Sequence, residues 1–158
     1  MLQRLSATAL ATFLLAVAVS GQTPPPMKHS APGTPGDPVW QGSLHMSDGR
    51  TFVTDGALAV DAAFAKPAAL PAREIPGKVL EGYIKAPHKD ECGFSDLTLA
   101  LSGKTYNSPT GIALNSTYIN FLRRVAPRGS RFRLTDGMHP VVVVAEGTAI
   151  AVLMPVKN

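Results

Sequence analysis

The stretch Val141-Val142-Val143-Val144-Ala145-Glu146-Gly147, followed by residues 148–154 (TAIAVLM), decides the fold. Four consecutive valines bounded by turn residues are typical of a β-strand that is buried on both faces and lies inside its sheet. Glu146-Gly147 turns the chain back, so residues 148–154 are expected to form the neighbouring strand. The sequence therefore predicts a central strand pair around which the rest of the domain is arranged.

A third strand precedes this pair. Residues 130–135 alternate strictly, which places Phe132 and Leu134 on one face and Arg131 and Arg133 on the other. The apolar face is expected to join the core, and the arginine face is expected to be exposed.

Glycine turns mark further strands towards the N-terminus. Asp48-Gly49 and Ser102-Gly103 predict hairpins over residues 41–54 and 96–107, because glycine readily takes the positive φ angles of tight turns. Residues 78–86 (KVLEGYIKA) alternate and are expected to form a strand. Residues 57–65 fit either a helix or a strand. No internal repeat is evident.

One helix is expected, at about residues 116–126. Asn115 or Ser116 can cap it, apolar residues from Tyr118 to Val125 recur at helical spacing, and Pro127 ends it. The predicted fold class is therefore α+β and β-rich, with a mostly antiparallel sheet of about six to eight short strands and this helix packed on it.

The N-terminus carries the pattern of a cleavable signal peptide over residues 1–20. Arg4 precedes an apolar stretch from Ala9 to Val19, and small residues at Ala18 and Ser20 predict cleavage before Gly21. Residues 21–38 are rich in proline and glycine and predict a disordered leader. Residues 39–158 are expected to form a single globular domain, since about 120 residues suffice for one core.

These features predict an exported protein, periplasmic or extracellular. The apolar stretch near the N-terminus is too short for a membrane-spanning helix, which needs about 20 residues. The apolar stretch 141–156 is interrupted by Glu146-Gly147. The sequence thus predicts a soluble product with no transmembrane segment after signal cleavage.

Basic residues are unevenly distributed. Residues 97–135 contain no acidic residue and six basic ones, of which five are arginines: Arg123, Arg124, Arg128, Arg131 and Arg133. Such asymmetry is typical of contact with an anionic partner, although a solvated basic face is the simpler interpretation. Anionic lipid, polysaccharide or acidic protein are the expected partners. Nucleic acid is disfavoured because no aromatic residue is interleaved for base stacking.

Two histidine–methionine pairs form an alternative candidate site: His45 with Met46, and Met138 with His139. Imidazole and thioether suit copper. Neighbouring strand residues point to opposite faces, however, so an exposed histidine beside a core methionine is the simpler interpretation. No cofactor is otherwise indicated.

The single cysteine, Cys92, lies four residues after His88. A thiol beside a base can act as a nucleophile, but Asp90 and Glu91 oppose thiolate formation, and a buried thiol is the simpler interpretation. No local catalytic motif is present.

The leading hypothesis is a non-catalytic binding or interaction module that contacts an anionic envelope component or an acidic protein. A periplasmic copper-binding protein is the alternative, and a thiol or hydrolytic enzyme centred on Cys92 is the second alternative.

Overall fold

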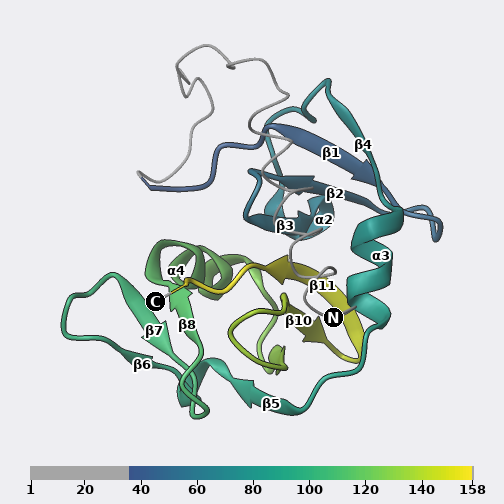
Figure 1. Cartoon of the computed structure of the whole chain (residues 1–158). Helices are drawn as coiled ribbons and strands as arrows, with labels where there is room; N and C mark the ends of the chain where they lie inside the picture. Colours follow the sequence, from purple (N-terminus) through teal and green to yellow (C-terminus); the bar gives the residue numbers. More distant parts are fainter. Residues whose placement is uncertain (1–35, 158) are drawn as a thin grey trace.

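The structure, a computed structural model, describes residues 36–157 (Figure 1). The predicted signal peptide and most of the predicted leader lie outside the described residues. The fold is α+β and β-rich, as the sequence predicts, with eleven strands and three α-helices in the described part. The strands are β1 (Gly42–His45), β2 (Thr51–Thr54), β3 (Leu58–Asp61), β4 (Glu74–Pro76), β5 (Asp90–Gly93), β6 (Thr98–Leu99), β7 (Thr105–Asn107), β8 (Ala113–Asn115), β9 (Arg131–Leu134), β10 (Val141–Ala145) and β11 (Thr148–Leu153). The helices are α2 (Ala62–Ala65), α3 (Lys78–Lys85) and α4 (Ser116–Val125), with a 3₁₀ turn at Phe94–Asp96.

Eight strands form one sheet in the order β4-β1-β2-β3-β11-β10-β9-β5. Its neighbours are antiparallel except for β1 and β4, which pair in parallel. The remaining strands form a separate antiparallel sheet, β6-β7-β8. The sequence predicted one sheet of about six to eight strands. The structure differs in having two sheets and more strands in total.

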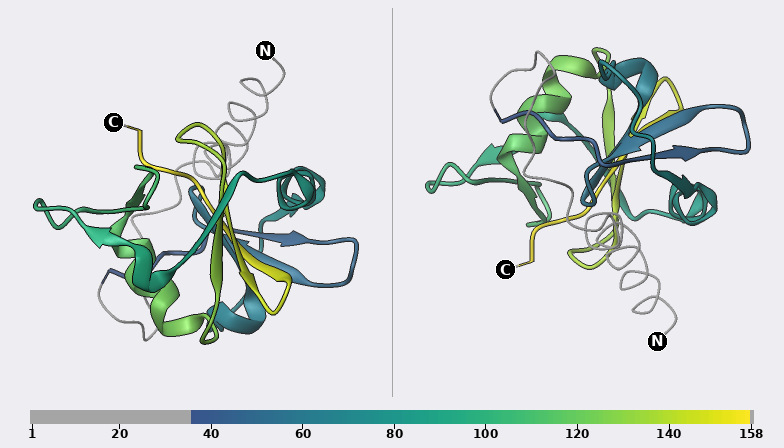
Figure 2. Two further views of the ribbon diagram at one scale, coloured as in Figure 1. Left: turned by 90° about the horizontal axis from the view of Figure 1, so that it is seen from below. Right: turned by 90° about the horizontal axis from the view of Figure 1, so that it is seen from above.

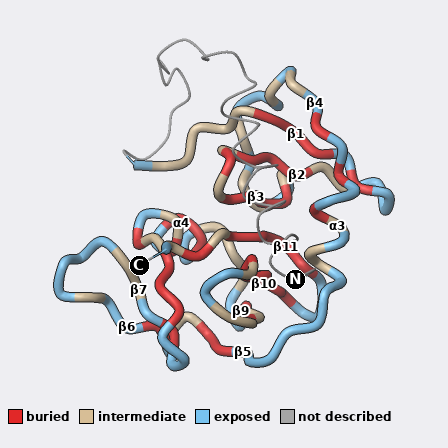
Figure 3. The backbone as a smooth tube through the Cα atoms, viewed as in Figure 1, coloured by how far each residue is buried: buried red, intermediate tan, exposed pale blue. Residues whose placement is uncertain are grey.

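The valine strand lies inside the large sheet, between β11 and β9, as predicted. All five residues of β10 are buried, and they alternate between two core clusters. Val141 and Val143 belong to the larger cluster, and Val142 and Val144 to the smaller one. The turn to β11 places Glu146 and Gly147 at positive φ. Figure 3 shows this continuous burial along β10 and β11.

Helix α4 covers the face of the larger cluster. The Asn115 side chain accepts a hydrogen bond from the Thr117 backbone N–H at 2.8 Å and so caps the helix. Ile119 and Leu122 are fully buried against the sheet. The helix ends at Val125, before Pro127, as predicted.

Helix α3 covers the opposite face, so the prediction of a strand over residues 78–86 is wrong. Leu80, Tyr83 and Ile84 lie three and four residues apart, which is helical spacing, and all three pack on the smaller cluster. The apparent alternation is therefore a by-product of a short amphipathic helix. Figure 2 shows α3 and α4 on opposite sides of the large sheet.

The ambiguous stretch 57–65 forms both elements in turn, strand β3 and then helix α2. The Asp61 side chain caps α2 by accepting a hydrogen bond from the Ala63 N–H at 2.9 Å. Within residues 36–157, no helix is long and apolar enough to cross a membrane.

The structure contains an internal repeat. Strands β1-β2-β3 form a first meander, and β6-β7-β8 form a second; each leads through an Asp or Asn cap into a helix. Matching positions share their environment: Leu58 and Ile112, like Val60 and Leu114, lie in the larger cluster. Matching residues of the two meanders are 54 apart along the chain, from Thr51 and Thr105 to Asp61 and Asn115. The register differs by one residue, because Asp61 pairs with Phe52 whereas Asn115 pairs with Thr105.

The C-terminal segment joins the two meanders. The Met154 N–H donates to the Ala57 carbonyl at 3.0 Å, beside β3, and the Val156 N–H donates to the Ala113 carbonyl of β8 at 2.8 Å. The Tyr118 hydroxyl of α4 also donates to the Asp55 carboxylate at 2.6 Å, in the turn between β2 and β3. The two meanders are therefore held around one shared core.

The packing of α3 can be tested by Leu80→Ala. Because Leu80 is fully buried, we expect a loss of about 2–5 kcal/mol in the free energy of unfolding, measured by urea denaturation. Val79→Ala is the matched control on the exposed side of α3 and should cost less than about 0.5 kcal/mol. Equal effects of the two substitutions would contradict this packing.

Candidate functional site

Strands β5 and β9 place the two strand arginines on the exposed edge of the large sheet. Cys92 lies opposite Phe132, and both side chains enter the larger core cluster. Arg131 and Arg133 therefore project to the other face, as the alternation predicts. Both approach Glu91 of β5.

Glu91 gathers positive charge on this face. Its Oε1 accepts a hydrogen bond from Arg131 Nε at 3.1 Å, and its Oε2 lies 3.7 Å from Arg133 Nε and 4.0 Å from His88 Nε2. In the described part of the chain, no hydrogen bond uses the terminal nitrogens of either arginine. These nitrogens remain available as donors to an anion.

Arg123, in the last turn of α4, is held between two aromatic rings. Its guanidinium carbon lies 5.5 Å from the centre of the Phe94 ring and 5.3 Å from that of Tyr106. One terminal nitrogen also donates to the Phe94 carbonyl at 3.4 Å. Within residues 36–157, no carboxylate lies within ion-pair distance of Arg123. The side chain is thus exposed, positioned and uncompensated.

Arg123 and Arg131 both lie near the end of β5, Arg131 on the outer face of the sheet and Arg123 beside Phe94, which packs against the larger cluster. A Cβ atom added at Gly93 would lie 3.4 Å from Arg131 Nη1, and the next residue, Phe94, lies under Arg123. Arg131 and Arg133 therefore share one face of β9, and Arg123 lies beyond them at Phe94, just after β5. We call these three residues the arginine strip.

The other two candidate arginines are placed differently. Arg124 forms an ion pair with Asp37 and lies 5.5 Å from the centre of the Phe121 ring. Arg128 is exposed in the loop between α4 and β9. The structure thus brings Arg131 and Arg133 together at Glu91 and places Arg123 at the end of the same edge strand.

The histidine–methionine pairs do not converge. Val141, two residues after His139, pairs with Leu153, which in turn pairs with Leu58 at the start of β3. His45 lies beyond the pair of Phe52 and Asp61, at the opposite end of these strands. Among the residues that the structure describes, no group of three His, Cys, Asp or Glu side chains could hold a metal ion.

Each histidine instead has a local partner. His45 Nε2 lies 3.0 Å from Glu74 Oε1, and its Nδ1 lies 3.3 Å from the Thr51 hydroxyl. Met46 is buried in the smaller cluster. His139 Nδ1 lies 2.6 Å from Asp136 Oδ1, beside the exposed Met138. The first pair matches the simpler interpretation of an exposed histidine beside a core methionine, whereas in the second pair the methionine is exposed and the histidine is half-buried.

Cys92 is buried, with 3% of its surface exposed, and its thiol faces the core. Burial, with the Asp96 carboxylate second, raises the pKa of the Cys92 thiol above its usual value. His88, on the other hand, lies near Glu91. The structure therefore does not pair the thiol with the candidate base.

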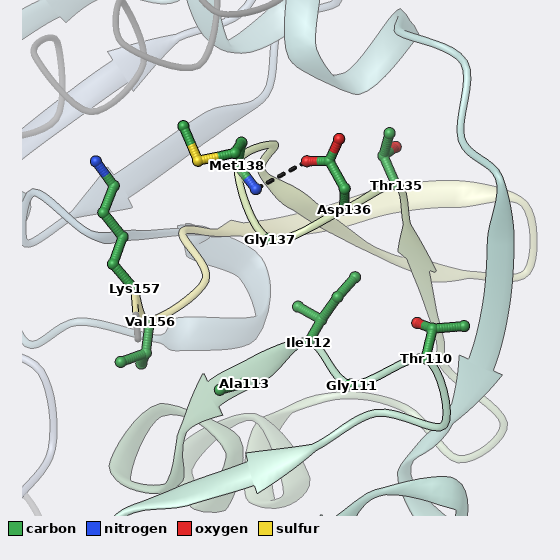
Figure 4. A pocket seen from close by; sticks show the side chains of 10 residues that line it. All are labelled: Thr110, Gly111, Ile112, Ala113, Thr135, Asp136, Gly137, Met138, Val156 and Lys157. Atoms are coloured by element: carbon green, nitrogen blue, oxygen red, sulfur yellow. Dashed lines mark hydrogen bonds between the residues drawn. The ribbon is translucent and has the colours of Figure 1, made fainter.

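A hollow of about 450 Å³ lies between the loop before β8, the loop after β9 and the C-terminal segment (Figure 4). Sequence reasoning singled out only Met138 of its lining. Its acidic group, Asp136, is engaged by its own turn and accepts hydrogen bonds from the Met138 and His139 N–H groups at 2.8 and 3.1 Å. Partial burial tends to raise the pKa of Asp136, but the bonds from His139 and Met138 outweigh it and lower the pKa.

No family model, no curated protein and no solved structure matches this chain. The site is therefore interpreted from its own geometry.

The inward orientation of Cys92 predicts its reactivity. Because the thiolate is the reactive form and burial disfavours it, a disulfide reagent such as 5,5′-dithiobis(2-nitrobenzoate) should react far more slowly with the folded protein than with the urea-unfolded protein. The release of the coloured thiolate measures both rates. Equal rates would show an accessible, activated thiol and would favour the enzyme alternative.

Proposed function

We propose that this protein is a non-catalytic binding module, acting outside the cytoplasm, that binds a linear polyanion through the arginine strip. The observation that carries the proposal is the placement of Arg123 between Phe94 and Tyr106. A stacked guanidinium keeps its in-plane N–H groups for carboxylate or phosphate oxygens, and its fixed position lowers the entropy lost on binding.

Charge around the strip supports this proposal. The three arginines of the strip stand against three carboxylates of β5 and the turn after it, Asp90, Glu91 and Asp96. Arg128 adds exposed positive charge in the loop that follows α4. The small positive excess that results, and the terminal nitrogens of Arg131 and Arg133 that are free in the described part of the chain, favour an anionic ligand at this edge.

The shape of the strip favours a chain-like ligand over a flat surface. The arginines follow the edge strand β5, which has no strand partner on its outer side in the described part of the chain. An extended acidic polysaccharide or acidic protein segment fits such an edge better than a lipid bilayer. Nucleic acid is disfavoured, because Arg123 covers one face of each aromatic ring that bases would stack on.

Export supports the same interpretation. The apolar pattern from Ala9 to Val19 lies outside the described residues, and its role as a signal peptide is part of the proposal. Acidic polymers are available to an exported protein at the cell envelope.

The strip can be tested with Arg123→Gln, Arg131→Gln and Arg133→Gln combined. Each exposed ion contact contributes about 0.2–1 kcal/mol, so binding to poly-glutamate or alginate, measured by calorimetry at low salt, should weaken about tenfold. Lys66→Gln, Lys78→Gln and Lys85→Gln combined remove the same charge elsewhere and should leave most of the binding intact.

If the two triple variants weakened binding equally, net charge alone would explain the effect, and this result would contradict a defined site. Binding only to vesicles of phosphatidylglycerol would identify a lipid surface as the partner instead. Absence of binding to all of these probes would overturn the proposal.

The aromatic clamp on Arg123 can be tested without changing charge. Tyr106→Leu removes one ring, and an exposed cation–π contact contributes about 0.5–1 kcal/mol, so affinity for the same polyanion should fall about two- to fivefold. Tyr106→Phe keeps the ring, loses only the hydroxyl bond to Asn120, and should bind like the wild type. Equal losses for both variants would show that the ring does not position Arg123.

A further inference from the structure

The outer edges of the strands in the described structure differ in how they are protected. The edge strand β4 carries the exposed Glu74 and ends in Pro76, which has no N–H to donate. The edge strand β5 carries the exposed carboxylates Asp90 and Glu91. Charges and prolines on edge strands prevent pairing with other chains.

The small sheet has one protected edge and one open edge. On β8, the Ala113 carbonyl accepts the Val156 N–H, so the C-terminal segment occupies that edge. On β6 the exposed residues Thr98 and Leu99 are uncharged, as is the exposed Leu101 in the turn that follows. Leu99 is 51% exposed, and Leu101 is completely exposed. Figure 3 shows the β6–β7 hairpin projecting from the body of the protein as an exposed element.

The internal repeat shows what covers the matching edge elsewhere in the chain. In the first meander the outer strand is β1, and β4 pairs along it, with Leu44 opposite Ile75. Leu44 pairs with Phe52 of β2 just as Leu99 pairs with Tyr106 of β7. Leu44 is fully buried, whereas Leu99 is half exposed. The second meander therefore has the same construction without its covering strand.

We propose that β6 pairs with β6 of a second copy of this chain, in antiparallel orientation across a two-fold axis. The two three-stranded sheets then become one six-stranded sheet. The pairing uses the outward-facing backbone groups of Leu99, because those of Thr98 and Ala100 face β7, and it buries Leu99 and Leu101 of both copies against one another.

Charge favours a second copy as the occupant. From Leu97 to Asn107 the only charged residue is Lys104, which lies beyond the hairpin turn and on β7's side of it. Two such edges can approach without like-charge repulsion, and the edge carries no charge that would select a different protein. The interface adjoins the arginine strip, since Leu99 lies opposite Tyr106, but dimerisation and polyanion binding are measured separately, so either proposal can fail alone.

The test is the mass of the purified protein over a wide concentration range, measured by sedimentation equilibrium. The wild type should approach twice the chain mass of 16.6 kDa, or of its processed form, as concentration rises. Leu99→Lys and Leu101→Lys, made separately, each place a protecting charge on the edge and should stay monomeric at the same concentrations. Leu101 contacts no core, so Leu101→Lys keeps the test valid if Leu99→Lys disturbs folding.

Leu70→Lys is the matched control, because Leu70 is also 51% exposed but lies outside the strands. It should dimerise like the wild type. A wild type that remains monomeric at every concentration would overturn the proposal. So would dimers of unchanged strength in both edge variants, because another surface would then form the interface.

Discussion

The antiparallel pairing of β10 with β11 is the constraint on which the rest of the structure depends. Both strands are buried on both faces, so each must be covered twice. Alternate residues of β10 belong to the two different core clusters, one on each face of the sheet. Each face must therefore be covered by a layer of other elements. Helix α4 and the second meander supply one layer, and α3 supplies the other. Both helices are amphipathic because each meets the same central strands from one side only.

This arrangement leaves the margins of the molecule for contact with other molecules. The centre is apolar and closed, and its single thiol and most of its aromatic rings serve packing. The candidate site lies where β5 and β9 end the large sheet and α4 ends above them, so three elements each contribute one or two side chains. Arg123 depends on both sheets at once, since Phe94 follows the large sheet and Tyr106 belongs to the small one.

The sequence was informative where a local pattern and tertiary packing agree. The valine run predicted the central strand, Asn115 predicted the helix cap, and the alternation around Phe132 placed Arg131 and Arg133 on one face. It failed where two periods fit the same residues, as in 78–86, and at the repeat, where few of the matching residues are identical. The aromatic clamp on Arg123 could not be predicted, because Phe94 and Tyr106 are distant in sequence and reach the helix only through tertiary packing. For the same reason, neighbouring His–Met pairs gave no information on distance: His45 and His139 lie at opposite ends of the sheet.

The place of β11 also determines the order in which the protein can fold. β11 lies between β3 and β10, so the first meander has no link to the rest of the large sheet until this strand arrives. Pairings between segments so far apart in the chain close large loops and form slowly. Early folding is therefore restricted to local units such as the β1–β2 hairpin. The large sheet can close only when the chain through Leu153 is available.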